Sequence, residues 1–379
     1  IKMYPMLKVQ EYLLKFEDKD EALEALKNEF AIKVITNTED DLVILNYDMI
    51  DTPKTDPIVR ECRGLVLDKN AVWYKDVGVK ANGWKLVARS FYRFFNHCEG
   101  EHSEFDWSNV EAQHKEDGSL IMVYTHNGKL RINTKGSFGY GEINDSGYTW
   151  NSLVTECLSK VKYIPPLPTA TYVFELCSIY NKVVRHYSTP KLYLLAAFDT
   201  YCNEIDIDDS LIAGYFNVFE RPESFIIHSI DEAIEYIKAK EREDATFEGL
   251  VLKDKNGNRM KVKSASYLML HRSANNGNIT WESIYDSCLT DDGGEEFTNF
   301  FPEYKDRFDK MKDFIKQSKE DIVETYNKYK DIEVQKDFAL AIKGYRFAPI
   351  LFALRKGEGT VDELFLSRSS AILKIFSLT

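Results

Sequence analysis

The sequence of 379 residues lacks an apolar run long enough to span a bilayer, and its N-terminus lacks the basic and then apolar pattern of a secretory leader. It is also poor in cysteine, because its six cysteines are scattered and form no C-x-x-C pair. These absences argue against a transmembrane protein, a disulfide framework and a cysteine-based zinc site. We therefore expect a cytoplasmic protein with reduced, mostly buried thiols.

Positive charge is also in deficit, and the formal net charge is −12. This acidity argues against a protein whose whole surface binds nucleic acid, but it is compatible with one local basic groove. No internal repeat or low-complexity tract is present. The length of 379 residues and an apolar fraction of 44% favour a large core divided between two domains.

From about residue 40 to 265, short β-branched and aromatic runs alternate with Gly, Asn and Asp, which is typical of antiparallel strands. Two hairpins are predicted, one joining 120–124 to 129–133 through Asn127-Gly128, the other joining 249–253 to 259–263 through Asn256-Gly257. In the last of these strands Lys261 and Lys263 share one face, because side chains alternate.

The pattern changes after about residue 266. Apolar residues recur at helical spacing among charged ones from Tyr304 to Tyr329, and the segments 338–342 and 346–354 continue in the same way. We predict an α+β protein, with an antiparallel-sheet domain over residues 1–266 and an all-α domain over residues 267–379.

The most informative motif is the pentad Lys115-Glu116-Asp117-Gly118-Ser119. An amine that attacks phosphorus must lose its proton, so nearby positive charge or a metal is needed to favour the neutral form. Lys135, Lys261 and Lys263 are candidates for that charge, and they could also hold phosphates. On the pentad alone, a solvated lysine beside an Asp117-Gly118 turn is the favoured interpretation.

Two acidic residues lie in apolar surroundings: Glu175 within the predicted strand 172–176, and Glu248 just before Gly249. Carboxylates there are costly unless they bind a metal, orient the amine or are paired. The alternatives are that Glu175 pairs with a buried arginine and that Glu248 is a charge at a hairpin edge. Lys261 and Lys263 could likewise form the wet face of an edge strand.

Taken in order, five motifs resemble the conserved series of the covalent nucleotidyltransferases, which include ATP-dependent DNA ligases, RNA ligases and mRNA capping enzymes. They are Lys115-Glu116-Asp117-Gly118-Ser119, Thr134-Lys135-Gly136-Ser137, Val173-Phe174-Glu175-Leu176, Phe247-Glu248-Gly249-Leu250-Val251 and Lys261-Val262-Lys263. Upstream, Glu61-Cys62-Arg63-Gly64-Leu65 and the segment 89–96 resemble the RNA ligase 1 family of T-even phages. The resemblance implies that the first domain is an antiparallel-sheet nucleotidyltransferase, that is, an ATP-grasp-like ligase domain.

The resemblance also implies residue roles. Lys115 would form the lysyl-AMP, with Lys261 and Lys263 as catalytic lysines on the triphosphate. Glu175 and Glu248 would bind the adenosine and a Mg²⁺ ion, and ATP would be the substrate. The remaining binding residues implied are Arg63, Arg93, Phe95, Gly118, Lys135, Lys182, Gly249 and Tyr267. Arg93 stands where the family has a lysine, so it keeps the charge but reaches differently.

The function that follows is an ATP-dependent RNA ligase, monomeric and in the host cytoplasm if phage-encoded, acting on single-stranded RNA or a broken tRNA anticodon loop. A DNA ligase, a capping enzyme and a non-catalytic RNA-binding protein are the alternatives, although the first two normally carry an OB barrel after the last motif. Asp291 and Asp292 could hold a cation, but an acidic interdomain loop explains them better. His114 and His186 are interpreted as packing residues.

Overall fold

The computed structural model describes residues 5–47, 55–76, 78–97, 105–181, 184–272, 279–290 and 294–379. The chain divides into two compact units, residues 1–271 and 272–379. The predicted boundary at 266/267 falls inside α6, which runs from Ala265 to Arg272.

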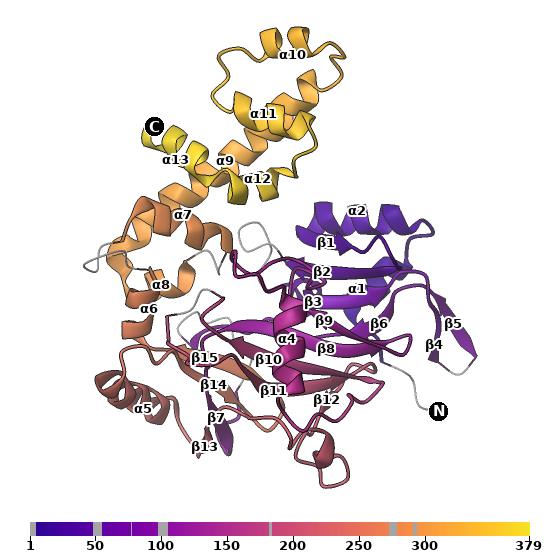
Figure 1. Ribbon diagram of the computed structural model, residues 1–379, viewed down its shortest axis with the longest axis vertical. Coiled ribbons are helices and arrows are strands. Elements are labelled where there is room, and N and C mark those ends of the chain that lie inside the picture. Colours follow the sequence, from indigo (N-terminus) through magenta and orange to yellow (C-terminus); the bar gives the residue numbers. More distant parts are fainter. Residues whose placement is uncertain are drawn as a thin grey trace. The chain divides into compact units, whose positions relative to one another are not determined.

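The first unit is built on antiparallel sheets (Figure 1). One sheet has the order β1-β2-β3-β6, with bounds Ile32–Thr36, Leu42–Tyr47, Arg63–Asp68 and Lys85–Ala88. A second has the order β12-β11-β10-β8-β9, with bounds Glu204–Ile205, Lys191–Asp199, Ala170–Cys177, Ser119–His126 and Lys129–Asn133. The third has the order β13-β7-β14-β15, with bounds Ser224–Ile227, Val110–His114, Gly249–Lys253 and Arg259–Lys263. A ribbon of β4 (Val72–Asp76) and β5 (Val79–Asn82) completes the described strands.

Both predicted hairpins are confirmed. β8 pairs with β9 across Asn127 and Gly128, whose φ angles of 51° and 75° are those of a tight two-residue turn between twisted strands. β14 pairs with β15 from Gly249↔Lys263 to Lys253↔Arg259. Local turn chemistry was sufficient to predict these elements, because both partners are adjacent in the sequence.

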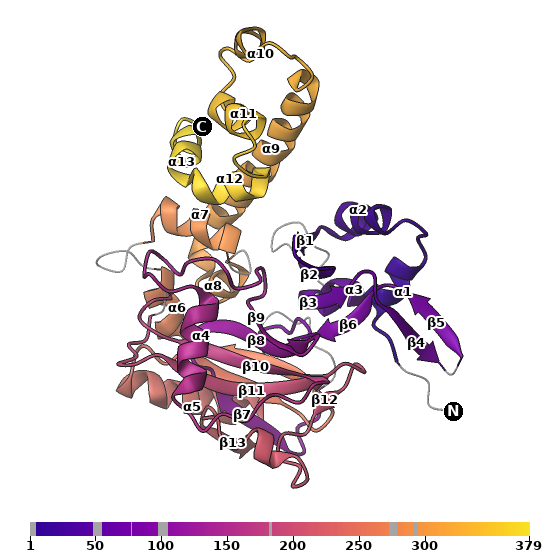
Figure 2. The same cartoon turned by 45° about the vertical axis from the view of Figure 1, so that its right-hand side comes forward.

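Each large sheet buries one face under helices. α1 (Lys8–Leu14) and α2 (Lys19–Phe30) contribute Leu13, Leu26 and other side chains to the core of the first sheet. α4 (Trp150–Ser159) packs on the second sheet, as Figure 2 shows, and α5 (Ile230–Glu243) packs on the third. The short α3 (Pro57–Glu61) and the 3₁₀ turn η2 (Ala213–Tyr215) complete the unit.

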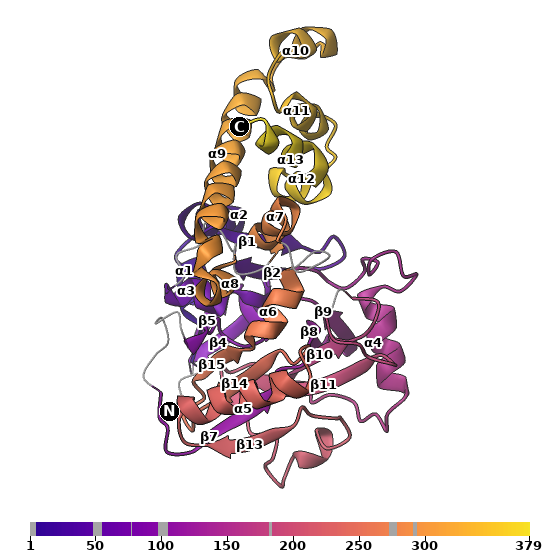
Figure 3. The ribbon, with the colours of Figure 1, turned by 90° about the vertical axis from the view of Figure 1, so that its left-hand side faces the viewer.

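The second unit is helical throughout its described residues, which confirms the predicted all-α character. Its elements are α7 (Trp281–Thr290), α8 (Glu295–Phe300), η4 (Pro302–Tyr304), α9 (Lys305–Tyr329), α10 (Gln335–Ala341), α11 (Ala348–Arg355), α12 (Val361–Ser367) and α13 (Ser369–Ser377). The long helix α9 is clearest in Figure 3. Phe314 on α9 packs against Phe347 and against Phe376 of α13, so the apolar stripe of α9 is covered by later helices.

Of the helices in the described residues, none combines the length and apolar composition needed to cross a membrane. Five cysteines fall in the described residues: all are free thiols, and four of them are buried. This agrees with the expectation of reduced, mostly buried thiols.

Candidate active site

Lys115 lies where the chain passes from one sheet to another. β7 ends at His114 in the third sheet, and β8 begins at Ser119 in the second. The backbone N–H of Lys115 donates to the Gly249 carbonyl at 2.9 Å, which extends the β7–β14 ladder by one residue. Its side chain is 24% exposed. Lys115 is therefore held at a crossover between sheets, and the alternative of a solvated turn lysine does not describe it.

The amine of Lys115 is oriented by Glu248, the residue before β14. Lys115 Nζ donates to Glu248 Oε1 at 2.6 Å, and Lys263 Nζ lies 3.3 Å from the same oxygen. The Gly249↔Lys263 pairing brings Lys263 to this point. Glu248 is 4% exposed, so it is not a hairpin-edge charge.

The charged group at 2.6 Å from this amine is the Glu248 carboxylate, and the idea that neighbouring cations favour the neutral amine stays a prediction. The same carboxylate is placed to accept the proton when the amine is deprotonated.

Two glycines of the motifs are required by close backbone approach. A Cβ on Gly118 would lie 2.2 Å from the Leu176 carbonyl oxygen, and one on Gly249 would lie 2.2 Å from the Val262 carbonyl oxygen. Gly249 also has a φ of 141°, which disfavours any other residue. Both glycines therefore shape the backbone around Lys115.

Asp117 connects the nucleophile segment to two others. Its Oδ1 accepts from the Tyr267 hydroxyl at 2.9 Å, and its Oδ2 accepts the N–H groups of Val184 and Arg185 at 2.6 and 2.8 Å. Burial raises the pKa of this carboxyl, and the nearby Glu248 charge adds to the effect. Tyr267 thus positions the nucleophile segment from α6.

Sequence reasoning gave no role to Tyr187, which completes this arrangement. The Tyr187 hydroxyl accepts the Asp117 N–H at 3.0 Å and donates to Glu116 Oε2 at 3.0 Å. Arg185 Nη1 lies 3.6 Å from the same Glu116 oxygen. A lone tyrosine carries no pattern in the sequence, so only the fold reveals these contacts.

Glu175 faces the same site from β10, where it pairs with Leu120 of β8. Desolvation raises its pKa to about 7, although the positive charges of Lys115 and Lys135 oppose the rise. No ion pair with an arginine is formed within the described part of the chain. The alternative of a buried arginine partner is therefore not seen.

A cluster of cations surrounds the buried ring of Tyr47 at the end of β2. Burial alone would raise the pKa of Tyr47, yet the cations lower it. They are Arg63, Lys135, Arg93 and Lys261. Since Lys135 also acts on Glu175, this cation cluster adjoins the Lys115 site.

Two arginines of the cation cluster are held by aromatic rings rather than by acids. Arg93, 5% exposed, lies 4.6 Å from the Tyr47 ring centroid and 5.2 Å from that of Phe95. Arg63 lies 5.3 Å from the Phe94 centroid. Buried Arg63 Nε and Arg93 Nη1 have no hydrogen-bond partner among the described residues. Such cations are costly to bury unless an anion joins them.

Lys261 and Lys263 lie on β15, the edge of the third sheet. The edge is covered, because the Lys261 N–H donates to the Phe95 carbonyl at 3.1 Å and Asn96 bridges to Lys261. Lys263 is 13% exposed. The wet edge-strand alternative is therefore wrong for this pair, and both amines point to the face that bears Glu248 or the Phe94 ring.

Metal binding would depend on Glu175 and Glu248. Within the described ranges, no group of three or more His, Cys, Asp or Glu residues could hold a metal by itself. Mg²⁺ is commonly bound through one or two carboxylates together with substrate phosphates, so two glutamates beside a phosphate site fit that ion. Lys182, Asp291 and Asp292 lie outside the described residues.

His114 packs as expected. Its Nε2 lies 2.6 Å from the Tyr236 hydroxyl, and its ring contacts that of Phe247 edge-on at 5.0 Å. These contacts place it in the aromatic core beside α5.

Comparisons with known proteins identify the family of this chain. A family model described as RNA ligase, of the T4 RNA ligase 1 type, matches residues 61–268. A protein of Autographa californica nuclear polyhedrosis virus, provisionally described as a bifunctional polynucleotide kinase/RNA ligase, is 29% identical over 269 residues, which are 65% of this chain. The match covers 36% of that relative's length.

Solved structures give weaker likenesses. An archaeal ATP-dependent RNA ligase has a TM-score of 0.46 and 12% identity, covering 75% of this chain and 69% of its own. An RNA ligase variant of Naegleria gruberi, solved with ATP and Mn, has a TM-score of 0.31 and 15% identity, covering 43% of this chain and 51% of its own.

Proposed function

This chain belongs to the RNA ligase family whose model matches residues 61–268, and we propose that it is an ATP-dependent ligase joining 5′-phosphate to 3′-hydroxyl RNA ends. The observation that carries the proposal is a sheltered amine, that of Lys115, beside cations that have no carboxylate partner. Arg63, Arg93 and Lys261 form no ion pair with an acid among the described residues, in a chain of net charge −12.

The reaction would begin at Lys115. Glu248 accepts a proton from its ammonium group, and the free amine attacks the α-phosphorus of ATP, forming an N–P bond as pyrophosphate leaves. The cation cluster holds the phosphates and stabilises the charge that develops on them.

Two RNA-dependent steps would follow. An oxygen of the 5′-phosphate attacks the adenylate phosphorus, and the lysine amine leaves with a proton. The 3′-hydroxyl then attacks the 5′-phosphorus, and AMP leaves as the new phosphodiester forms. Mg²⁺, held by Glu175 and Glu248, would supply charge neutralisation on phosphate oxygens.

The helical second unit would select the RNA. Single-stranded RNA, including a broken tRNA anticodon loop, is the substrate we propose, with a monomer acting in the host cytoplasm. A DNA ligase or a capping enzyme would need an OB barrel after β15, and no strand follows β15 in the described residues.

Labelling with α-labelled ATP tests the nucleophile. The wild-type protein should become covalently labelled, and Lys115→Ala should fall to background because the attacking amine is gone. Lys255→Ala removes an exposed lysine that pairs with Asp106 at 3.0 Å and should label normally. A fully labelled Lys115→Ala protein would show that another residue is the nucleophile.

Substrate choice separates the alternatives. GTP labelling in place of ATP labelling would indicate a capping-type enzyme. A 5′-phosphorylated single-stranded RNA should be circularised, whereas a protein that binds this RNA but is never labelled would be a non-catalytic module.

A further inference from the structure

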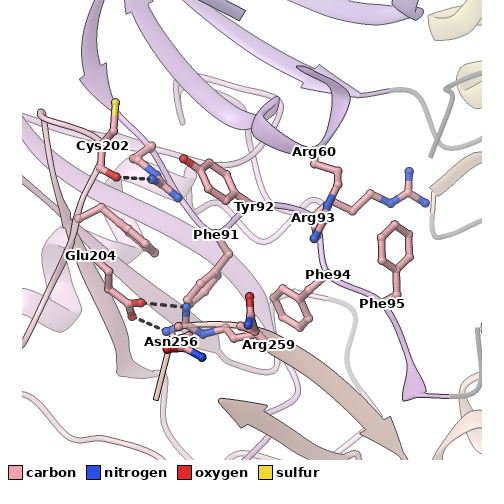
Figure 4. Close-up of a pocket in the computed structure, with 14 residues that line it drawn as sticks. Arg60, Phe91, Tyr92, Arg93, Phe94, Phe95, Cys202, Glu204, Asn256 and Arg259 are labelled. Atoms are coloured by element: carbon pink, nitrogen blue, oxygen red, sulfur yellow. Dashed lines mark hydrogen bonds and ion pairs between the residues drawn. The ribbon is translucent and has the colours of Figure 1, made fainter. Parts of the chain in front are cut away.

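A cavity of about 190 Å³ in the first unit shares Arg93 with the cation cluster, but its other arginines have no part in the steps above (Figure 4). Its walls come from Arg60 of α3, the segment 89–95, Phe198 to Glu204, and the turn 256–259 between β14 and β15. A water molecule occupies about 30 Å³ in the liquid, so the cavity can admit a tetrahedral oxyanion with some of its hydration.

The lining is strongly positive, with four arginines against one glutamate. The glutamate, Glu204, is already neutralised, because it forms an ion pair with Arg259 and lies 3.3 Å from Lys253 Nζ. Figure 4 draws dashed lines from Glu204 to Arg259, and another from the Cys202 carbonyl to Arg89. Arg60, Arg89 and Arg93 form no direct ion pair with a carboxylate among the described residues.

Arg89 is the most deeply buried of the three, with 4% of its surface exposed. Its guanidinium lies 4.0 Å from the Tyr92 ring centroid and 4.4 Å from that of Phe198. It donates to the peptide carbonyls of Ser90 at 3.1 Å and Cys202 at 3.4 Å, and it also donates a hydrogen bond to the Tyr92 hydroxyl. These groups hold the guanidinium in place, and the charges of Glu204 and Glu61 reach it without a direct ion pair.

Arg60 and Arg93 present further donors. Arg60 uses only Nε, which donates to the Arg93 carbonyl at 3.1 Å, so its terminal nitrogens have no partner in the described part of the chain. Arg93 Nη1 is buried and unpartnered among the same residues. Guanidinium groups with spare donors match the several acceptor oxygens of a phosphate.

We propose that Arg60 and Arg89 of this arginine cavity bind a backbone phosphate of the RNA substrate, one nucleotide or more from the reacting end, while Arg93 belongs to the cation cluster. The inference rests on the proposed ligase function.

Arg259 lies four positions from Lys263 along β15, about 13 Å at 3.3 Å per residue, so the hairpin wall of the cavity is remote from the Lys263 amine. Lys261 of the cation cluster lies between them, and its amine is 6.0 Å from the Phe94 ring centroid, so the cavity adjoins the proposed ATP site. An RNA strand leaving the reacting end can cover that distance.

The test uses the full chain with Arg60→Gln, Arg89→Gln and Arg60→Lys. Labelling of Lys115 by ATP should stay at the wild-type level, with an unchanged KM for ATP. The Kd for a 5′-phosphorylated oligoribonucleotide should rise roughly tenfold in each glutamine variant, because a charge-assisted bond to phosphate is lost. Arg60→Lys should restore part of the affinity.

The salt dependence of RNA binding separates a phosphate contact from a purely structural role of the arginine, because a structural role would not change it. The slope of log Kd against log salt should fall by about 0.7 if one phosphate contact of a single strand is lost. Arg221→Gln is the matched control, since it removes one arginine that already pairs with Asp208 at 2.6 Å. It should leave both affinity and slope unchanged.

Two results would overturn the proposal. A raised KM for ATP with normal RNA affinity would assign the cavity to the triphosphate, and unchanged RNA affinity and slope would leave it without a ligand role. If Arg89→Gln unfolds at a lower temperature than the wild-type protein, its RNA affinity is not interpretable. The result for Arg60→Gln, which lies at a less buried position, then decides between the outcomes. Absence of labelling in the wild-type protein would instead refute the ligase function, while the RNA-binding arms still report on the cavity.

Discussion

Among single residues, Glu175 links protein stability to pH in the neutral range. Its pKa is raised from 4.5 to about 7 by desolvation, so the folded protein holds this proton more tightly than the unfolded chain does. The contribution of Glu175 to the free energy of unfolding is therefore complete below about pH 4.5, and it is lost as the pH rises towards 7.

We therefore expect Glu175→Gln to change the pH dependence of unfolding. Relative to the wild-type protein, the variant should gain up to about 3 kcal/mol in its free energy of unfolding between pH 4.5 and 8, because Gln cannot ionise. Denaturant titrations across that pH range measure the difference. Glu156→Gln, on the solvent side of α4, should keep the wild-type profile, and parallel profiles for Glu175→Gln would contradict the prediction.

The sequence was informative at residues whose type and order are constrained by chemistry. Lys115, Glu248 and Lys263 were predicted as one site, and the structure places the amines of Lys115 and Lys263 within 3.3 Å of one Glu248 oxygen. Arg89 and Tyr187 were not predicted as functional, because their significance depends on burial and on partners distant in the sequence.

At the scale of elements, the segment between β7 and β8 depends on a glycine. Gly118→Ala would place a methyl group against the Leu176 carbonyl oxygen at 2.2 Å and the Cys177 Sγ at 3.0 Å, where β10 pairs with β8. The backbone must shift, and we expect a loss of about 1–3 kcal/mol in the free energy of unfolding.

Gly214→Ala is the matched control for this prediction, since a Cβ there meets nothing within 4 Å. It should be neutral or stabilise the protein by a few tenths of a kcal/mol. Thermal or denaturant unfolding of both variants measures the difference. Equal stability of the two would contradict the prediction, because it would show that β10 can move away from the added methyl group without loss of stability.

Elements close in sequence were predicted well, and their long-range pairing was not. Asn127-Gly128 specified one hairpin through its turn alone. The pairing of β7 with β14, which joins Gln113 to Val251, has no local signal because it depends on packing of the whole third sheet. That pairing is what brings Lys115 to Glu248.

For the whole molecule, the division into two units predicts separable activities. Every candidate catalytic residue, from Arg63 to Tyr267, lies in residues 1–271. A chain ending at His271 should still be labelled by ATP, but it should join RNA ends poorly because the proposed RNA-selecting unit is missing.

Residues 272–379 alone supply the control, since they lack Lys115 and should not be labelled. Circular dichroism of both fragments tests whether each is folded. A folded 1–271 fragment without labelling would show that the helical unit is required for the first step, and unchanged RNA joining would remove its proposed role in substrate selection.

The position of Glu248 between two ammonium groups has a consequence for the order of events. A phosphoramidate nitrogen carries no positive charge, so adenylation leaves Lys263, now 3.3 Å from Glu248 Oε1, as the nearest remaining counter-charge. The phosphoryl group of AMP also brings one negative charge, so the adenylated and the free enzyme differ by two units of charge at this position. That difference would let an incoming RNA end distinguish the adenylated enzyme from the free one without any large rearrangement of the chain.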